Sequence, residues 1–325
     1  MDEPKPTVIA EKDIISTLMH KEQVQRLEHI IAIDSQRLED LRRIFGKRLD
    51  YGPKLGLDEA KQEFPGIKKE VDAFLEVKWI RQPEVYQQGF LGTIKENKGL
   101  AYGYLHSGIL ACIGSFLGSN TLEYMLGTGI SGEAILKGMV SLGTIALGSA
   151  GLKDTLQEHR VRTLNEASYD CLYRQIIITS TRQVPSIIKL AHEYTHHVQG
   201  VKGINLMEPK QKAFIEGHAR GTTRQLALKY AMLKENPAFI HCHINLQDLA
   251  ELKSAYTWVS EKLGIKAYPS IIKAKALMDA EESYRIKETK EPGQHALGNA
   301  FFYAQELVQG NSIYRDVLKG EFQVK

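Results

Sequence analysis

Residues 191–200 read Ala-His-Glu-Tyr-Thr-His-His-Val-Gln-Gly and contain the pattern His-Glu-x-x-His. On a helix, side chains four residues apart share a face, so the imidazoles of His192 and His196 can converge on one metal ion. Glu193 lies beside the first ligand, where its carboxylate can take a proton from metal-bound water without binding the metal itself. The pattern therefore predicts two ligands and the general base of a zinc hydrolase.

The residues around this pattern favour a helix. Pro185 suits a first helical turn, where its missing N–H would have no partner, and Gly200 stands where helices often end. Between them, apolar residues recur at spacings of three and four: Ile187, Leu190, Tyr194 and Val198. We therefore expect His192 and His196 to lie on one helix.

A catalytic zinc site needs a third protein ligand. One known solution places a third His six residues after the second, but that position here is Lys202. The other takes a Glu from a following helix, and Glu216 lies twenty residues after His196 in a segment that follows Pro209. Two His and one Glu leave the fourth tetrahedral position to water. We expect Zn²⁺ at His192, His196 and Glu216, with Asp248 as the alternative acidic ligand.

Two stretches carry a resemblance to a known family. His-Glu-x-x-His-x-x-Gln from His192 to Gln199, followed by an apolar residue and Glu-Gly-x-Ala from Ile215 to Ala219, resembles the gluzincin-type zinc metallopeptidases. The resemblance covers about residues 165–225. It implies that the two histidines and Glu216 are the ligands and that the glutamate after the first histidine is the general base.

His218 departs from the family pattern, in which an acidic or small residue is expected between Gly217 and Ala219. On a helix it points away from Glu216, so we expect it behind the ligands or facing solvent. A looser similarity covers residues 292–302, where related peptidases open a late helix with Tyr, then Gly, then Phe. His295 stands where that Tyr would be.

The looser similarity implies a role in catalysis for the late helix. His295 could donate to the oxyanion of the tetrahedral intermediate. Tyr303 is a second candidate for this role, and ordinary helix packing is the alternative for both residues.

Composition limits the class of protein. With 325 residues, 43% hydrophobic and 25% charged, the chain is an ordinary globular protein with room for one large domain or two. A net charge of +3 is too small to indicate a nucleic-acid partner. Three widely spaced cysteines form no disulfide framework, and the N-terminus is polar without an apolar signal segment. These features predict a cytoplasmic protein.

Residues 1–98 are expected to form an N-terminal helical region. Apolar periodicity predicts a long helix over 11–46 and a second from about Ile67 to Trp79, with Pro65 in the preceding loop. Leu75, Val77, Trp79 and Ile80 are expected in the core. The alternative is that the region is a prosegment or lid over the active site.

Residues 99–153 form a glycine-rich apolar segment. Residues 99–122 contain no Asp, Glu, Lys or Arg, and residues 134–152 contain only Lys137. Both halves are long enough to cross a bilayer. Basic residues flank the outer ends and acidic residues lie between the halves: Lys95, Lys98, Lys153, Arg160 and Arg162 outside, Glu123 and Glu133 between. The segment is either a membrane-inserted hairpin with both termini cytoplasmic or a buried hairpin of a soluble protein.

Residues 154–325 are expected to be the metallopeptidase domain. Residues 170–180 predict a strand directly before the active-site helix, either with an edge that pairs with a peptide or within the core. Helices are predicted over 246–263 and 270–286. His241-Cys242-His243 has the wrong spacing for a self-contained metal site.

These observations predict an α+β fold, mainly α and zincin-like, with a small sheet. The predicted function is that of a zinc metalloendopeptidase, which hydrolyses a peptide or protein through a zinc-activated water with Glu193 as general base. The alternative is a non-catalytic zincin-like scaffold or adaptor, associated with a membrane. A third hypothesis, that the motif histidines are only core or surface residues, conflicts with the presence of Glu216 in its own motif.

Overall fold

A computed structural model describes most of the chain, and its residues divide into two compact units. One unit comprises Met1–Tyr86 and Ala167–Lys325, and the other comprises Gln87–Glu166. The described residues are 5–45, 49–87, 105–113, 115–117, 119, 139–153, 168–171, 174–178, 182–244, 246–265 and 292–325. The predicted helix over 270–286 lies outside them.

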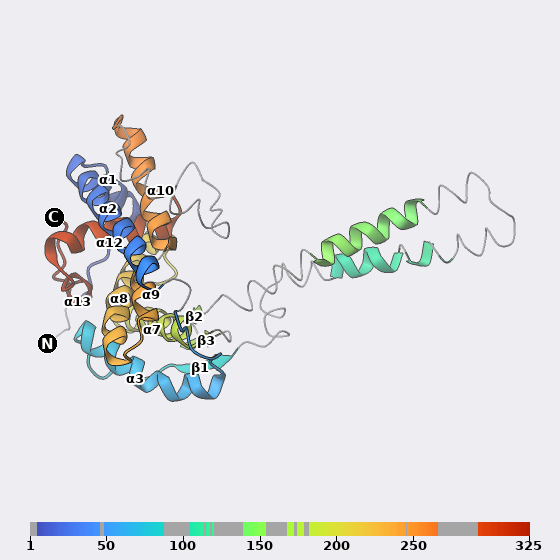
Figure 1. Ribbon diagram of the computed structural model, residues 1–325, viewed down its shortest axis with the longest axis horizontal. Helices are drawn as coiled ribbons and strands as arrows, with labels where there is room; N and C mark the ends of the chain where they lie inside the picture. The colour runs from blue at the N-terminus through green and yellow to red at the C-terminus, as the bar shows by residue number, and fades with distance from the viewer. Residues whose placement is uncertain are drawn as a thin grey trace, which may run out of the picture. The chain divides into compact units, whose positions relative to one another are not determined.

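The described part of the larger unit is mainly helical with one small sheet (Figure 1). This confirms the mainly helical α+β class. In chain order the elements are α1 (Glu11–Leu18), α2 (Lys21–Phe45), α3 (Leu57–Leu75), β1 (Glu84–Gln87), β2 (Ser168–Asp170), β3 (Gln175–Ile178), α7 (Gln183–Val201), the short 3₁₀ helix η1 (Pro209–Gln211), α8 (Lys212–Leu233), α9 (Ala238–His243), α10 (Leu246–Leu263), α12 (Gln294–Gln309) and α13 (Ile313–Lys319).

Helix α7 carries the His-Glu-x-x-His pattern, as predicted. It has no side-chain cap at its N-terminus, and the preceding loop supplies acceptors instead. The backbone N–H of Gln183 donates to the carbonyl of Pro53 at 2.8 Å, and that of Val184 donates to the carbonyl of Tyr51 at 3.1 Å. These bonds satisfy donors that a helix start otherwise leaves without partners. The loop between α2 and α3 therefore fixes where α7 begins.

Helix α8 packs beside α7 and crosses α12 at very short range. A Cβ built on Gly217 of α8 would lie 2.8 Å from the Cα of Gly298 of α12, a distance that real Cβ atoms essentially never show. Only glycine at both positions lets the two backbones touch. The crossing fixes the first turn of α12 beside the second turn of α8.

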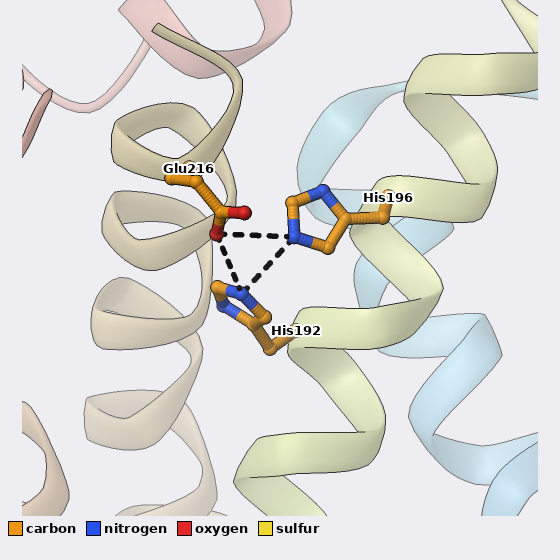
Figure 2. Close-up of side chains that lie close together, drawn as sticks. All are labelled: His192, His196 and Glu216. Carbon is orange, nitrogen blue, oxygen red and sulfur yellow. Dashed lines mark hydrogen bonds and ion pairs between the residues drawn. The ribbon is translucent and has the colours of Figure 1, made fainter. Parts of the chain in front are cut away.

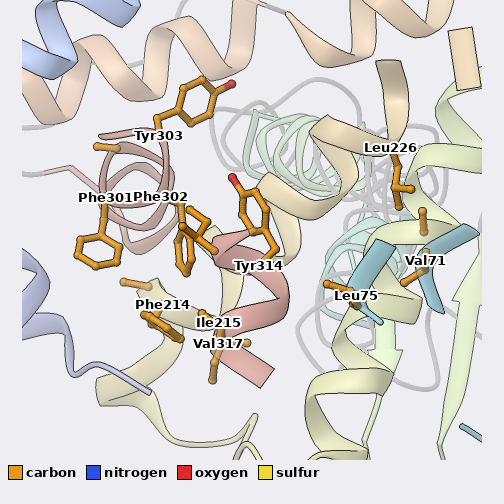
Figure 3. Packing of buried hydrophobic residues seen from close by; sticks show 14 of the residues in the cluster. Val71, Leu75, Phe214, Ile215, Leu226, Phe301, Phe302, Tyr303, Tyr314 and Val317 are labelled. Carbon is orange, nitrogen blue, oxygen red and sulfur yellow. The ribbon is translucent and has the colours of Figure 1, made fainter. Parts of the chain in front are cut away.

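An aromatic core surrounds this crossing. Phe214 of α8, Phe301 and Phe302 of α12 and Tyr314 of α13 are all buried and converge in Figure 3. The ring centroids of Phe214 and Phe302 are 5.0 Å apart, and those of Phe302 and Tyr314 are 5.7 Å apart. Aromatic pairs at such separations stabilise a core beyond the area that they bury. The core holds α8, α12 and α13 as one body.

The N-terminal helices differ from the prediction in three ways. The helix expected over 11–46 is two helices, because the chain turns at Met19 and His20. Helix α3 begins at Leu57, so Pro65 lies inside it rather than in a loop. Trp79 is 95% exposed and has a left-handed φ of 62°, so its assignment to the core was wrong. Leu75, Val77 and Ile80 are buried as predicted.

The N-terminal helices α1, α2 and α3 belong to the same compact unit as α7 and α8. Helix α3 packs on α7, and α2 packs on α10 and α12. That residues 1–98 form a prosegment or lid stays a prediction.

The sheet has the order β1-β3-β2, with β2 antiparallel to β3. Ser168 faces Ile177 and Asp170 faces Gln175 in the register. The strand predicted over 170–180 is therefore shorter, and Cys171 lies in a turn. Because β3 is the central strand, neither of its edges can take up a peptide; the edges of the described sheet belong to β1 and β2.

The smaller unit contains two described helical segments, one at 105–113, 115–117 and 119 and the other at 139–153, which we call the apolar helix pair. A Cβ on Gly148 would meet the backbone of Ala111 at 2.8 Å, and a Cβ on Gly151 would meet the hydroxyl of Ser107 at 2.8 Å. Because higher numbers on one helix meet lower numbers on the other, the two helices are antiparallel. Among the described residues, no helix combines the length and apolar character needed to cross a membrane.

Candidate metal centre

Three side chains from two neighbouring helices point at one position. His192 and His196 come from successive turns of α7, and Glu216 comes from α8 (Figure 2). The two Nε2 atoms are 3.1 Å apart, and Oε2 of Glu216 lies 3.5 Å from Nε2 of His192 and 3.4 Å from Nε2 of His196. Within the described residues, this is the group of three whose donor atoms converge as metal ligands do.

These distances fit a zinc ion. Zinc bonds to N and O of about 2.0–2.1 Å at tetrahedral angles put ligand atoms about 3.3 Å apart, close to the three observed separations. Two histidines and one carboxylate are also the donor set of catalytic zinc sites with one open position. The residues present therefore fit the ion that the sequence predicts.

A buried chain of hydrogen bonds fixes the protonated nitrogen of His196. Nε2 of His218 donates to the carbonyl of Tyr314 at 2.7 Å, which leaves Nδ1 of His218 to accept from the amide nitrogen of Gln199 at 2.9 Å. That nitrogen also donates to the carbonyl of Ile215 at 3.0 Å. The amide oxygen of Gln199 must then accept from Nδ1 of His196, 2.8 Å away.

This chain of hydrogen bonds holds His196 in one tautomer. With the Nδ1 proton of His196 held by Gln199, its Nε2 lone pair points to the candidate metal position. His218 is fully buried, in agreement with a place behind the ligands and not with exposure to solvent. Sequence reasoning missed the role of Gln199; the three-residue spacing of His196 and Gln199 on a helix was the available signal.

The charges around the centre favour a cation. Burial lowers the pKa of His192 to about 4, so this imidazole is neutral and able to bind metal at neutral pH. Burial alone would raise the pKa of Glu216, but hydrogen bonds to His192 and His196 hold it well below its usual range. Glu216 is therefore ionised. A neutral imidazole and a carboxylate are the forms that ligate metal.

Glu193 lies next to the ligands without joining them. Its side chain is 7% exposed, and burial raises its pKa to about 7, against the charge of His196 and a hydrogen bond from the backbone N–H of Tyr169 in β2. A carboxylate with a pKa near the working pH can both accept and release a proton. The position and environment of Glu193 suit the predicted general base.

His295 reaches the centre from the first turn of α12. Its Nδ1 lies 3.7 Å from Oε2 of Glu216, and its side chain is 54% exposed. The Gly217–Gly298 crossing brings it there, since His295 precedes Gly298 by one turn. Tyr303 is not at the centre: it is buried, with the guanidinium of Arg224 3.7 Å from its ring centroid.

The alternative ligands have other partners. Asp248 accepts hydrogen bonds from Arg220, with Oδ1 2.7 Å from Nε, so it holds this arginine rather than a metal. Nδ1 of His241 bonds to the hydroxyl of Tyr51 at 2.8 Å, and Nδ1 of His243 bonds to the carbonyl of Arg224 at 2.7 Å. The two histidines of the His-Cys-His run thus serve packing.

Comparisons of the chain with models of known protein families, with curated proteins and with solved structures found no match. The site therefore has to be interpreted from its own geometry.

Proposed function

We propose that this protein is a zinc-dependent metallopeptidase of the gluzincin type, with His192, His196 and Glu216 as ligands. The observation that carries the proposal is the 3.1–3.5 Å triangle of donor atoms, which matches tetrahedral zinc. Glu193 next to this triangle makes hydrolysis the chemistry that the residues suit best.

Each residue has a role that follows from its place. Zinc, when bound, supplies a Lewis acid that lowers the pKa of water toward about 7 and polarises a carbonyl. Glu193 takes the proton of the attacking water and passes it to the leaving amine, as its pKa of about 7 allows. His295, exposed and 3.7 Å from Glu216, can donate to the oxyanion that develops on the substrate.

The proposed substrate is a peptide or protein. The candidate centre is not sealed inside the molecule: the side chain of the ligand His192 is partly exposed, and that of the neighbouring His295 is open to solvent. Helix α7 also packs against β2, an edge strand of the described sheet, which offers backbone groups to an extended chain. An open site beside a strand edge suits a polymer better than a small enclosed ligand.

The test measures metal and hydrolysis in the same preparations. Wild type purified without chelator is expected to contain one zinc per chain by mass spectrometry and to cleave members of a peptide library. Glu216→Ala is expected to lose the metal and the activity. Glu193→Gln is expected to keep the metal and lose at least a hundredfold in kcat, since general base catalysis contributes about 10²–10⁴-fold.

The matched control is Glu261→Gln, which removes an exposed carboxylate from α10 and is expected to change neither zinc content nor hydrolysis. A Glu193→Gln variant as active as wild type would refute the mechanism. Zinc without hydrolysis in wild type would favour the competing proposal, a metal-binding scaffold that performs no catalysis. Absence of metal in wild type would contradict both.

A further inference from the structure

The apolar helix pair exposes many of its apolar side chains and buries two of its hydroxyl side chains. Nine of its large apolar residues are exposed, at 39–69% of their surface: Leu105, Ile109, Ile113, Phe116, Met139, Val140, Leu142, Leu147 and Leu152. Three others are half-buried: Leu110, Leu117 and Ile145. By contrast, the hydroxyl residues Ser107 and Ser141 are buried. Water-soluble helix pairs bury their apolar side chains against one another. This pair turns most of them outward.

The contact between the two helices is made by small residues. Gly148 lies against the backbone of Ala111, at a distance that leaves no room for a larger side chain, and Gly151 lies against the hydroxyl of Ser107. Helices in a bilayer associate in this way, because lipid chains are as apolar as Leu and burying Leu between helices gains nothing there. The small-residue contact and the outward apolar residues thus favour the same surroundings.

Exposed hydroxyl groups on the pair are satisfied within their own helices. Ser115 donates to the carbonyl of Ala111 at 2.9 Å, and Thr144 donates to that of Val140 at 2.8 Å. Such bonds remove the need for water, which hydrocarbon cannot supply. The polar atoms on the outside of the pair therefore do not oppose transfer into lipid.

The exposed apolar residues surround helix 139–153 instead of lining one side. At about 100° per residue, Met139, Val140, Leu142 and Leu152 point in widely different directions. One protein partner docked on one face would leave several of them in water. The hydrocarbon chains of a bilayer would contact all of these side chains at once.

Charge complementarity identifies the end that faces the lipid headgroups. Among the described residues of the pair, the one Lys, Arg, Asp or Glu is Lys153, on the end where Ser107 meets Gly151. In the sequence, Lys95 and Lys98 precede residue 105, and Arg160 and Arg162 follow Lys153. Basic residues next to an apolar segment are attracted to anionic headgroups by about 1 kcal/mol each.

From these observations we propose that the apolar helix pair inserts into an anionic lipid bilayer from one side, with Lys153 at the headgroups. Fifteen residues of helix span about 22 Å, less than the roughly 30 Å hydrocarbon core, so the described part of each helix enters the bilayer without crossing it. Because the helices are antiparallel, the chain enters and leaves on one side. This proposal stands independently of any peptidase activity.

The test uses the full-length protein and vesicles of two compositions, pure phosphatidylcholine and phosphatidylcholine with 30% phosphatidylglycerol. The protein is expected to float with the anionic vesicles and to stay with them after a carbonate wash. Cys112 is exposed on the helix pair, so an environment-sensitive fluorophore attached there reports insertion. Its emission is expected to shift to the blue with anionic vesicles and to be quenched by brominated lipid chains.

Two variants test the outward apolar residues. Leu142→Glu and Phe116→Glu each place a charge where the proposal puts lipid, and each is expected to reduce vesicle binding at least tenfold. Met232→Glu is the control, since it removes an equally exposed apolar residue from α8 in the other unit. It is expected to bind vesicles as wild type does. Circular dichroism checks that all three variants are folded.

Several results would overturn the proposal. Binding to neither type of vesicle, or a fluorophore at Cys112 that stays in water, would exclude insertion. Equal binding to neutral vesicles would refute the role of the basic end. A blue shift without vesicles, together with self-association that Leu142→Glu abolishes, would mean that a second copy of the chain covers the apolar residues.

Discussion

Gly217 and Gly298 lie in backbone contact, where α8 crosses α12. A Cβ on Gly217 would come within 2.8 Å of the Cα of Gly298, so neither position accommodates any other residue without a shift. Glu216 immediately precedes the first of these glycines, and His295 lies one turn before the second. The contact therefore determines the 3.7 Å separation of Glu216 and His295.

The first prediction concerns this contact. Gly217→Ala is expected to force α8 and α12 apart and to lower the free energy of unfolding by about 1–3 kcal/mol or more, as overpacking does. Zinc affinity is expected to fall as well, because Glu216 moves. Urea unfolding and zinc titration measure the two effects. Gly66→Ala in α3 is the control: nothing lies within 4 Å of its added Cβ, and Ala favours helix by about 1 kcal/mol over Gly.

The sequence predicted the convergence of the candidate metal ligands from residue spacing along a helix. His192 and His196 are four residues apart, so a helix alone brings them together, and the Pro209 start predicted the helix of Glu216. The structure brings all three together. The Gly217–Gly298 contact was not predictable, because the two residues are 81 positions apart and a glycine inside a helix does not indicate its partner.

The wrong predictions for the N-terminal helices and for Trp79 have a related cause. No Pro or Gly at Met19 and His20 marks a break, so the sequence alone favours one helix. In the structure the two helices pack on different sets of elements, α1 on α12 and α8, and α2 on α10 and α12. Trp79 was assigned to the core together with its apolar neighbours, but its backbone is left-handed and its side chain is exposed to solvent. Local patterns do not contain these tertiary effects.

The second prediction concerns Gln199. Gln199→Leu removes the acceptor for Nδ1 of His196, so the imidazole loses its fixed tautomer, and zinc affinity is expected to fall about 10–100-fold. Competition with a chelator of known affinity measures this change. Gln36→Leu, on the exposed face of α2, is the control. Equal affinities of wild type and Gln199→Leu would contradict the proposed relay.

The third prediction concerns pH and His243. Burial, followed by the charge of Arg224, lowers the pKa of His243 to about 4. Between about pH 6.5 and 4 the unfolded chain binds a proton here that the folded chain does not, so this residue reduces stability as the pH falls, by about 1.4 kcal/mol per unit. His243→Asn is expected to remove this loss. Urea unfolding at a series of pH values, with chelator present throughout, measures it.

Asp34 provides a control, because its effect on stability as the pH falls has the opposite sign to that of His243. Burial raises its pKa to about 6, against the charges of Arg224 and Arg37. Between about pH 6 and 3.8 the folded chain binds the extra proton, so this residue increases stability as the pH falls. Asp34→Asn is therefore expected to make acid destabilisation steeper than in wild type. The same direction of change in both variants would contradict the assignment of these two groups.

The fourth prediction concerns removal of the metal. A ligand that binds only the folded chain stabilises it by RT ln(1 + [L]/Kd), about 2.7 kcal/mol when free zinc is a hundred times Kd. Wild type is expected to lose this increment when a chelator is added and to regain it with excess zinc. Glu216→Ala is expected to show no increment, because it lacks the third ligand. Glu193→Gln is expected to show the full increment, since Glu193 lies outside the group of ligands. Thermal unfolding with zinc and with chelator measures all three, and a missing increment in Glu193→Gln would show that this residue supports the metal directly.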